Sequence, residues 1–456
     1  MIIRSAAALA ALGLLAPLAA CSGDSSDDPS GSRSPVVRSA EPIRLPAVLS
    51  LTGQLGTFGV PQELATRVAV NHINAHGGVL GRPLVVEAVD DATNPQQTTD
   101  QINALLQRRP AIVPLILGPT GSPNAISAAE LTFNAKVLLI SPSASTPTLS
   151  DAQPKAERYF FRTTGSHALQ ARALALLARQ GVPAAGGGGP NRVCTTAAVV
   201  YADDPYGEPI AEVFAQAFAA RGGTVSLRVG VPTMPKASYA DEVGRVVGAG
   251  VDCQVLVMFP GVGAQYAKDF KARVAEDATR DWAAFVTLGS NGLKDEAFIK
   301  GGRANPADPA GPTAGEGMVL TFFDLNPNSA AYNEFKNMYR AHYPAAAPTD
   351  EPAPYTASQF DAVVLAALAI QKAGTASDVG AIRQALFDVS RGGAAYSPSQ
   401  IAEALVAIGQ GVDVDYNGAS GPVDFDEAGD VLNDFRVYAI RDAAFAELEP
   451  IKASAL

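Results

Sequence analysis

Histidine and cysteine are scarce in this chain, which has 4 His and 3 Cys among 456 residues. The histidines are scattered, and no group of them has the spacing of zinc ligands. A Gly-x-Ser-x-Gly elbow is absent, no serine has an assigned histidine base, and the run Gly186 to Gly189 lacks the Lys-Ser/Thr of a phosphate loop. We therefore predict a protein that is not an enzyme and needs no metal or cofactor, and we interpret the glycine run as a surface linker.

Positive charge is also in deficit. Lys and Arg number 34 against 45 Asp and Glu, which gives a formal net charge of -11. Such a surface repels the phosphate backbone of nucleic acids, so nucleic-acid binding is not expected as a main role.

Long apolar runs without charges occur only at the start of the chain. Arg4 precedes an apolar stretch from Ala6 to Leu18, which is short for a permanent membrane helix. It ends in Leu18-Ala19-Ala20-Cys21, which resembles the bacterial lipoprotein cleavage box, where the cysteine is acylated. A plain secretory signal with an incidental cysteine is the alternative. We expect residues 1–21 to be a signal with a lipidated Cys21, and residues 22–41, rich in Ser, Asp, Gly and Pro, to be a flexible tether.

If Cys21 carries lipid, the other two cysteines remain as an even pair in an oxidising compartment. Cys194 and Cys253 each precede a short apolar run, Ala197 to Tyr201 and Gln254 to Phe259. If these runs are neighbouring parallel strands, both sulfurs start from the same sheet edge at a spacing near that of a disulfide. The pattern predicts a Cys194–Cys253 bond, with two buried free thiols as the alternative.

From residue 42 onward, short β-rich runs alternate with helical stretches. Leu64, Ala65, Val68, Ala69 and Ile73 recur at helical spacing between two strand candidates. The alternation restarts after Arg162, which indicates two α/β units with doubly wound parallel sheets. The expected strands are 43–49, 84–89, 112–117, 137–140, 197–201, 225–231, 254–259, 285–288 and 318–322, with further short strands in 422–442. The expected helices beyond the first are 168–179, 209–221, 264–274, 329–343 and 355–372.

In open parallel sheets, ligands bind beyond the carboxyl ends of the strands. After one such strand, Ser122 suits a helix N-cap and Pro123 the first helical position. Free N–H groups there favour an anion such as a carboxylate, although an ordinary capped helix is the simpler interpretation. The next strand ends in a turn with Ser143 and Ser145, whose hydroxyls both donate and accept.

Aromatic residues follow two other strand ends. Phe58 comes after the first strand of the first unit, and Tyr206 lies at a strand end of the second unit. A tyrosine at such a position is more often a packed surface residue. Opposite the serine turns it becomes a candidate lid.

Five motifs taken in order resemble the Leu/Ile/Val-type amino-acid-binding proteins, which are type I periplasmic binding proteins of ABC transporters. The motifs are Ile73 to Leu84, Gly118 to Ser122, Ser141 to Ser145, Asp203 to Gly207 and Gly421 to Asp426. The resemblance covers nearly all of residues 42–442. It implies two lobes joined by three crossovers, which we place at 42–162 plus 323–417 and at 163–322 plus 418–456.

The resemblance also assigns roles to site residues. Ser122 matches the position that binds the ligand carboxylate, and Ser143 and Ser145 match those that hold the carboxylate and amine. Phe58 and Tyr206 match the aromatic walls. Asn291 matches the position where amino-acid binders place an acid for the ligand ammonium, and Met258 to Gly261 lacks the tyrosine often found there. A neutral amide gives up a charge-assisted contact of ~1.5–3 kcal/mol, so a carboxylate, an amide or another small polar solute fits as well as an amino acid.

The sequence therefore predicts an extracytoplasmic, lipid-anchored, monomeric solute-binding protein. It would close by a hinge on a small polar ligand and deliver it to an ABC transporter permease. The alternative is a ligand-sensing protein that acts through a separate signalling partner.

Overall fold

The computed structural model describes residues 41–108, 115–182, 191–326, 328–343 and 351–456. Cys21, nearly all of the predicted tether, the start of the predicted strand 112–117 and the glycine run 186–189 lie outside these residues. None of the helices within the described ranges combines the length and the apolar character that a membrane crossing requires.

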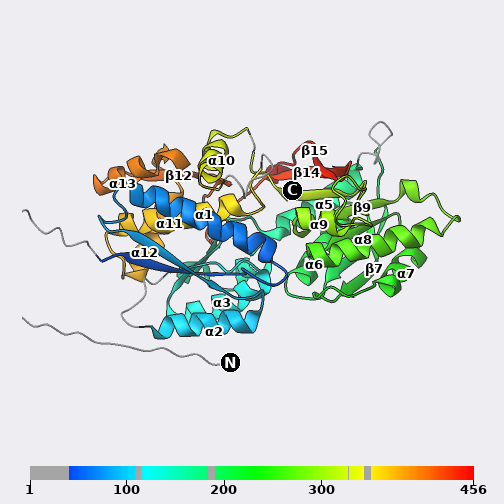
Figure 1. The fold of residues 1–456 in the computed structure, drawn as a ribbon, viewed down its shortest axis with the longest axis horizontal. Coiled ribbons are helices and arrows are strands. Elements are labelled where there is room, and N and C mark those ends of the chain that lie inside the picture. The colour runs from blue at the N-terminus through cyan, green and yellow to red at the C-terminus, as the bar shows by residue number, and fades with distance from the viewer. Residues whose placement is uncertain (1–40, 109–114, 183–190, 327, 344–350) are drawn as a thin grey trace, which may run out of the picture. The chain divides into compact units, whose positions relative to one another are not determined.

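A five-stranded parallel sheet organises the first part of the chain (Figure 1). Its spatial order is β2-β1-β3-β4-β5, and every adjacent pair is parallel. The strands are β1 (Ile43–Leu49), β2 (Leu84–Asp90), β3 (Leu115–Leu117), β4 (Leu138–Ser141) and β5 (Phe160–Arg162). We call this sheet and the helices packed on it the first lobe.

Helices cover both faces of this sheet. One face carries α1 (Gly56–Ala75), α10 (Ala330–His342), α11 (Thr356–Ala373), α12 (Val379–Ser390) and α13 (Ile401–Gly409), and these share a continuous apolar core with β1, β3 and β4. The other face carries α2 (Pro95–Gln107) and α3 (Ser122–Ala135) over a smaller apolar cluster. Residues Thr356 to Ile370 of α11 are all buried, which explains the apolar centre of that stretch.

A seven-stranded sheet organises the second lobe, in the order β15-β14-β10-β9-β8-β6-β7. Its strands are β6 (Thr196–Ala202), β7 (Thr224–Val231), β8 (Cys253–Val257), β9 (Val286–Gly289), β10 (Val319–Phe323), β14 (Phe435–Arg441) and β15 (Ala444–Glu447). The neighbouring strands β10, β9, β8, β6 and β7 are parallel, whereas β14 and β15 form an antiparallel edge next to β10.

Helices again cover both faces of the second sheet. On one face α5 (His167–Gln180) and α6 (Gly207–Ala220) pack over an apolar cluster that includes Phe214 and Phe218. On the other face lie α7 (Ala240–Gly248), α8 (Pro260–Ala275) and α9 (Glu296–Gly301). The connecting segments contain short one-turn helices, which are α4 (Thr148–Asp151), η1 (Lys155–Glu157), η2 (Trp282–Ala284), η3 (Asn291–Leu293), η4 (Pro398–Gln400) and η5 (Ala453–Ala455).

The chain passes between the lobes three times. It leaves β5 of the first sheet for α5, returns from β10 of the second sheet to α10, and passes from the first lobe back to β14. A three-stranded sheet of β11 (Ala394–Tyr396), β12 (Val414–Gly418) and β13 (Gly421–Pro422) precedes the last passage. Buried Asp361 of α11 accepts hydrogen bonds there from the N–H groups of Ala419 and Ser420, at 2.8 and 2.7 Å.

The predicted fold class is confirmed: the molecule is α/β, with parallel-sheet lobes wrapped by helices. One prediction is wrong in detail. Ser122 is not the N-cap of α3, because Gly121 holds that position and Ser122 is the first helical residue. Its hydroxyl instead accepts hydrogen bonds from the N–H groups of Ser145 and Thr146, both at 3.2 Å.

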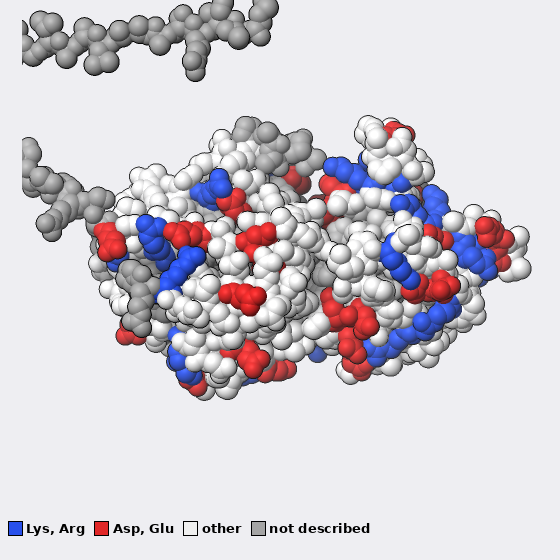
Figure 2. All heavy atoms as spheres, turned by 60° about the horizontal axis from the view of Figure 1, so that its bottom comes forward, with Lys and Arg blue, Asp and Glu red and all other residues white. Residues whose placement is uncertain are grey.

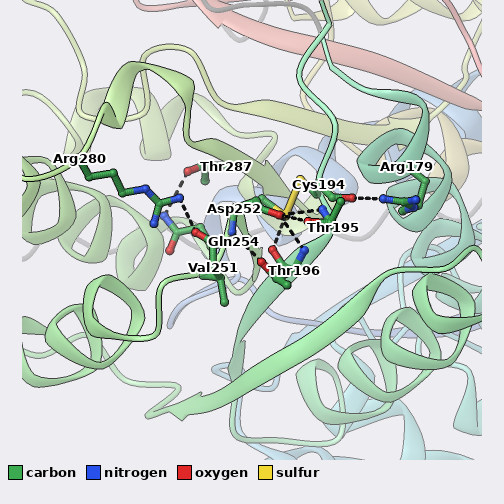
Figure 3. The surroundings of a disulfide bond; sticks show 10 residues. Arg179, Cys194, Thr195, Thr196, Val251, Asp252, Gln254, Arg280 and Thr287 are labelled. Atoms are coloured by element: carbon green, nitrogen blue, oxygen red, sulfur yellow. Dashed lines mark hydrogen bonds between the residues drawn. A yellow bond between two sulfur atoms is a disulfide. The ribbon is translucent and has the colours of Figure 1, made fainter.

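The predicted disulfide between Cys194 and Cys253 is present (Figure 3). Strands β6 and β8 are parallel neighbours, with Ala197 opposite Cys253, so both cysteines lie at the amino-terminal edge of the second sheet. The Asp252 carboxylate accepts hydrogen bonds from the N–H groups of Thr195 and Thr196, both at 2.9 Å, beside the bridge. The disulfide therefore closes the end of the sheet opposite to the carboxyl ends of the strands.

Acidic and basic side chains are interspersed over the face shown in Figure 2. Several ion pairs lie on the surface with both side chains exposed, such as Arg44 with Glu87 and Lys136 with Glu157. Exposed pairs contribute little to stability, whereas the pair of Arg162 with Asp430 is buried.

Candidate functional site

The carboxyl ends of the strands of both lobes contribute to one cavity. It is lined by residues that follow β1, β3 and β4 in the first lobe and β6, β8 and β9 in the second, together with Tyr355 at the start of α11. The lining residues are Leu55, Phe58, Thr120, Gly121, Ser122, Ser143, Ser145, Tyr206, Phe259, Asn291, Gly292 and Tyr355. All six residues that the sequence singled out thus lie around the same cavity.

The first-lobe side of the cavity is a set of buried hydroxyls held by a fixed network. Gln62 of α1 donates to Ser143 Oγ at 2.9 Å, and its amide oxygen accepts from Thr120 Oγ1 at 2.7 Å. Ser143 Oγ donates in turn to the Thr120 carbonyl at 2.8 Å. Because each partner is buried and paired, these hydroxyls have defined positions before any ligand arrives.

Ser145 is paired with a histidine that the sequence did not single out. Its Oγ lies 3.1 Å from the ring nitrogen Nδ1 of His167, the first residue of α5. The backbone N–H of His167 donates to the Ser145 carbonyl at 2.7 Å. Burial, with a contribution from the positive charge of Arg162, lowers the pKa of His167 well below its usual range. A neutral imidazole beside a hydroxyl orients that hydroxyl, and this corrects the expectation that no serine has a histidine partner.

The pair does not form a hydrolase triad. Nε2 of His167 is the ring nitrogen that faces away from Ser145, and a triad needs a carboxylate on it. None of the described residues places a carboxylate there. The ring instead packs against Phe323 and against the edge of Tyr206, with centroids 5.9 and 5.3 Å apart.

Aromatic rings form the walls of the cavity. Tyr206 stacks on Phe259 with ring centroids 4.7 Å apart, and Phe58 meets Tyr355 edge to face at 5.6 Å. Phe58 belongs to the first lobe, and Tyr206 and Phe259 belong to the second. Tyr355 lies at the entry to α11 with φ 65°, a left-handed conformation that is uncommon for a bulky residue.

A neutral polar group closes the second-lobe side. Tyr206 Oη lies 3.0 Å from Ser290 Oγ and donates to Asn291 Oδ1 at 3.3 Å. The Asn291 amide donates to Tyr355 Oη, so one side chain links both tyrosines. Burial raises the pKa of Tyr206 and of Tyr355, so both phenols stay protonated and act as neutral hydrogen-bonding groups.

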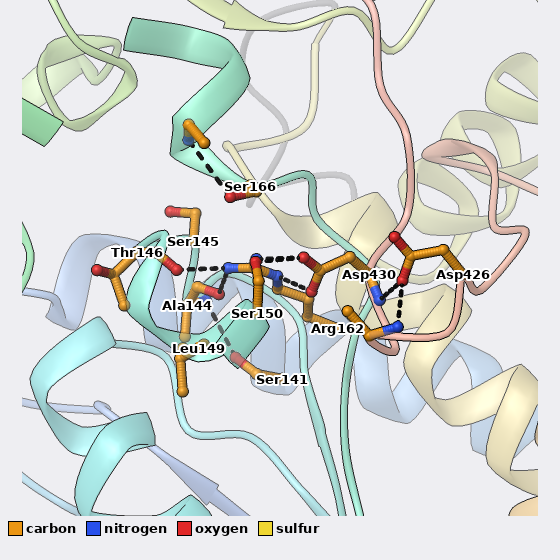
Figure 4. A network of polar contacts seen from close by, with 12 residues as sticks. Ser141, Ala144, Ser145, Thr146, Leu149, Ser150, Arg162, Ser166, Asp426 and Asp430 are labelled. Carbon is orange, nitrogen blue, oxygen red and sulfur yellow. Dashed lines mark hydrogen bonds and ion pairs between the residues drawn. The ribbon is translucent and has the colours of Figure 1, made fainter. Parts of the chain in front are cut away.

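A buried ion pair supports the serine turn from behind (Figure 4). Arg162, at the end of β5, donates to the carbonyls of Ala144 and Thr146 at 3.2 and 2.9 Å. The same guanidinium pairs with Asp430, and its exposed side-chain fraction is 0%. The turn that presents Ser145 is therefore tied to the segment that follows β13.

The cavity is small, and the lobes contact one another around it. Its volume is about 20 Å³, room for about one water molecule. Between the lobes, Thr146 Oγ1 of the first donates to the Pro205 carbonyl of the second at 2.9 Å, and the Gln54 amide donates to the Thr233 carbonyl. Any solute larger than water therefore enters only if the lining side chains or the lobes move apart.

Sequence reasoning missed three aromatic or imidazole groups of the site. Phe259 follows β8, so the strand-end rule that found Tyr206 also points to it. His167 follows β5 in the same way. Tyr355 follows no strand and reaches the cavity from the start of α11 in the first lobe, so no local pattern marks it. Among the described residues, no cluster of His, Cys, Asp and Glu is arranged to hold a metal ion.

Comparison with known proteins places the whole folded body in one family. A family model described as periplasmic binding protein matches residues 42–444. A chemotactic signal transduction system substrate-binding protein of Halobacterium salinarum is 25% identical over 91% of this chain and 90% of its own length. A leucine-, isoleucine-, valine-, threonine-, and alanine-binding protein of Pseudomonas aeruginosa is 26% identical over 88% and 90%.

Solved structures share the fold at lower identity. A leucine-binding protein LivK of Thermotoga maritima has a TM-score of 0.71 at 17% identity, covering 91% of this chain and all of its own. LivJ of Streptococcus pneumoniae, in complex with isoleucine, has a TM-score of 0.69 at 18%, over 90% and 100%. A solute-binding protein of Rhodopseudomonas palustris in complex with p-hydroxybenzoic acid has a TM-score of 0.69 at 18%, over 91% and 98%.

The family is one of extracytoplasmic solute-binding proteins rather than enzymes. Its model spans both sheets of this molecule, from β1 to the first residue of β15, and so includes every residue around the cavity. The chain belongs to the periplasmic binding protein family.

Proposed function

We propose that this protein captures a small polar solute, an amino acid or a related carboxylate or amide, and delivers it to an ABC transporter permease. The observation that carries the proposal is the convergence of buried hydroxyls from the first lobe and aromatic and amide groups from the second on one cavity. Concave sites with apolar walls and a few placed polar groups are typical of small-molecule binding.

The mechanism is hinge closure between the lobes, 42–162 plus 323–417 and 163–322 plus 418–456. Ser122, Ser143 and Ser145 bind the carboxylate first, next to the N-terminus of α3, where helix N–H groups lack intrahelical partners. Tyr206 and Asn291 then close over the ligand, and Phe58 packs against its apolar part. Closure removes water, which strengthens each polar contact. Three interlobe passages supply the hinge, since a few residues at element ends absorb such motions.

The anchor completes the proposal. Cys21 carries lipid, residues 22–41 tether the folded body, and the monomer meets the membrane through the anchor alone. The relatives support the solute class: the Pseudomonas aeruginosa protein is named for five amino acids, and the two structures with ligands hold isoleucine and p-hydroxybenzoic acid. These ligands share a carboxylate.

A thermal-shift screen of amino acids, short carboxylates, amides and sugars tests the proposal. A ligand that binds only the folded state raises the melting temperature by mass action. Ser122→Ala and Tyr206→Ala are expected to abolish the shift of the best ligand. Ser127→Ala, farther along α3, and Tyr396→Phe, on β11, are matched controls that should keep it. An intact shift in both site variants would show that the site is elsewhere.

Sensing through a separate signalling partner is the second candidate. The Halobacterium salinarum relative, named for a chemotactic system, favours it. A strain lacking this gene distinguishes the two roles. Loss of uptake of the radiolabelled ligand supports transport, whereas unchanged uptake with a lost behavioural or transcriptional response to the ligand supports sensing.

A further inference from the structure

The charges around the cavity bear on which solute fits it. Among the described lining residues, none has a charged side chain. A zwitterionic amino acid carries one negative and one positive group, and burying an unpaired ion is costly. The two ends of the cavity can therefore be compared for what each offers to an ion.

The first-lobe end suits an anion. Ser122, Ser143 and Ser145 offer hydroxyl groups, and α3 begins beside them with the positive end of its dipole. The Ser122 Oγ already accepts two backbone N–H groups, which leaves its own proton free to donate. A carboxylate there receives hydrogen bonds from several directions.

Among the described residues that line the second-lobe end of the cavity, none carries a carboxylate that would neutralise a cation. Its polar groups are the Asn291 amide and the phenols of Tyr206 and Tyr355, which bond to one another. Asp204, two residues before Tyr206, accepts hydrogen bonds from the backbone N–H groups of Tyr206 and Gly207 at 2.9 and 2.8 Å. Its carboxylate thereby caps the start of α6. An ammonium group would lose its hydration without a carboxylate in exchange.

The walls between the two ends favour an apolar, flat body. Phe58, Phe259, Tyr206 and Tyr355 present rings to the cavity, and such rings pack well against an aromatic or branched apolar group. The amide and phenols at the far end pair with an uncharged hydroxyl or carbonyl.

From these contacts we infer that the solute is a monocarboxylate without an amine, whose apolar body lies between the aromatic walls and whose far end is uncharged. The inference rests on the proposed function and narrows its solute class. Aromatic and branched aliphatic acids share the required chemistry, and the experiment separates them.

Titration calorimetry with matched compounds tests the inference on the purified protein. One set is leucine, 4-methylpentanoate and 3-methylbutylamine, which share the 3-methylbutyl carbon chain and differ in charged groups. The other is 3-(4-hydroxyphenyl)propanoate, its methyl ester and 4-hydroxyphenylalanine, which share the 4-hydroxyphenyl group and its carbon chain. The amine-free carboxylates are expected to bind at least about tenfold tighter than the amino acid of the same set, and the amine and the ester are expected not to bind. Comparison of the Kd of the aromatic acid with the Kd of the aliphatic acid then shows which apolar body the site accepts.

Two results would overturn the inference in different ways. Tighter binding of leucine or 4-hydroxyphenylalanine than of the acids disproves the amine-free class and leaves solute capture intact. If no compound of either set binds, and the broader thermal-shift screen also yields nothing, the proposed function itself fails.

Asn291→Asp gives an independent test, because it places a negative charge at the second-lobe end of the cavity. The carboxylate is nearly isosteric with the amide, and Tyr355 Oη can donate to it in place of accepting. The ratio of the leucine Kd to the 4-methylpentanoate Kd is expected to fall at least about tenfold. Asn305→Asp, in an exposed loop where the side chain accepts from the Ala307 N–H, is the matched control and should leave the ratio unchanged. An unchanged ratio in Asn291→Asp, with a melting temperature near that of the parent protein, contradicts the inference.

Discussion

The Arg162 guanidinium forms two parallel hydrogen bonds with the Asp430 carboxylate, Nε to Oδ1 at 2.6 Å and Nη2 to Oδ2 at 2.7 Å, across 268 positions of sequence. Both residues lie where the chain is passing between the lobes. The pair also fixes the turn that presents Ser145, because the same guanidinium donates to the carbonyls of Ala144 and Thr146. Hinge and ligand site therefore share one buried charge.

Breaking this pair should cost both stability and affinity. In Asp430→Asn the Arg162 charge stays buried without a counter-ion, and removal of one partner of such a pair typically costs ~3–5 kcal/mol. We expect a loss of that size in the free energy of urea unfolding. The affinity for the best solute should weaken as well, because the Ser145 turn loses its support.

An exposed ion pair nearby provides the control. Lys155 and Glu427 lie 3.7 Å apart with side chains 62% and 78% exposed, and they join the same two parts of the chain. Glu427→Gln should change the unfolding free energy by less than ~1 kcal/mol. Equal losses in the two variants would mean that the Arg162 pair has no special role.

The Cys194–Cys253 bridge should matter for stability and not for binding. It closes a loop with a sequence separation of 59, for which a loss of ~2–4 kcal/mol is typical when the bridge is removed. The bridge lies at the sheet edge opposite to the cavity. The Cys194→Ser/Cys253→Ser variant should therefore melt at a lower temperature and keep the solute Kd within about twofold. A large change in Kd at a temperature where the variant is folded would disprove this separation.

Local patterns were enough to predict most of the fold. Short runs of consecutive apolar residues located most of the strands, since buried parallel strands such as Leu115–Leu117 consist of such residues. Strands with exposed residues were missed, among them Ala394–Tyr396 and Ala444–Glu447, because they lack a run of buried apolar residues. Helices α7 and α13 were missed as well, although each has an apolar face.

The site followed the same division. Ser122, Ser143 and Ser145 follow neighbouring strands of one sheet, so sheet geometry alone predicts that they lie together. Tyr206 follows a strand of the other sheet, and its position opposite the serines was implied by the resemblance to the Leu/Ile/Val-type proteins. The place of Tyr355 depends on how α11 enters the first lobe, and the pairing of Ser145 with His167 depends on the passage from β5 to α5. No local pattern encodes either. The exact hydrogen-bond partner of Ser122 was likewise beyond sequence reasoning.

Stability should fall in mild acid because of His167. The folded protein keeps this imidazole neutral, since burial lowers its pKa well below 6.5, whereas the unfolded chain takes up a proton near pH 6.5. Below that pH the unfolded state binds more protons, so the free energy of unfolding decreases as the pH falls. By pH 5 this group costs up to ~2 kcal/mol relative to pH 7.5.

Comparison of variants isolates this contribution from the other titrating groups. Burial raises the pKa of Asp361 to about 6, so that group acts in the opposite direction, and it is present in every variant. Urea unfolding of His167→Gln between pH 7.5 and 5 should show a smaller decline than the parent protein. His76→Gln, at an exposed position, should follow the parent curve. A parallel decline in His167→Gln would show that the imidazole is not held neutral.

A methyl group at Gly292 should block the site without unfolding the protein. An added Cβ there would lie 2.6 Å from the Met258 carbonyl oxygen and 2.7 Å from Tyr206 Oη, closer than such atoms approach. The Met258 carbonyl belongs to the backbone and yields little, so Tyr206 or η3 must shift. Because Tyr206 bonds to Ser290 and Asn291, we expect Gly292→Ala to weaken solute binding at least about tenfold in calorimetry. Overpacking of this kind typically costs ~1–3 kcal/mol of stability.

Gly248→Ala, with open space around the added methyl at the end of α7, should bind the solute normally and be slightly more stable. Normal affinity in Gly292→Ala would mean that the second-lobe wall moves freely on binding and that the contacts of Tyr206 do not hold the ligand.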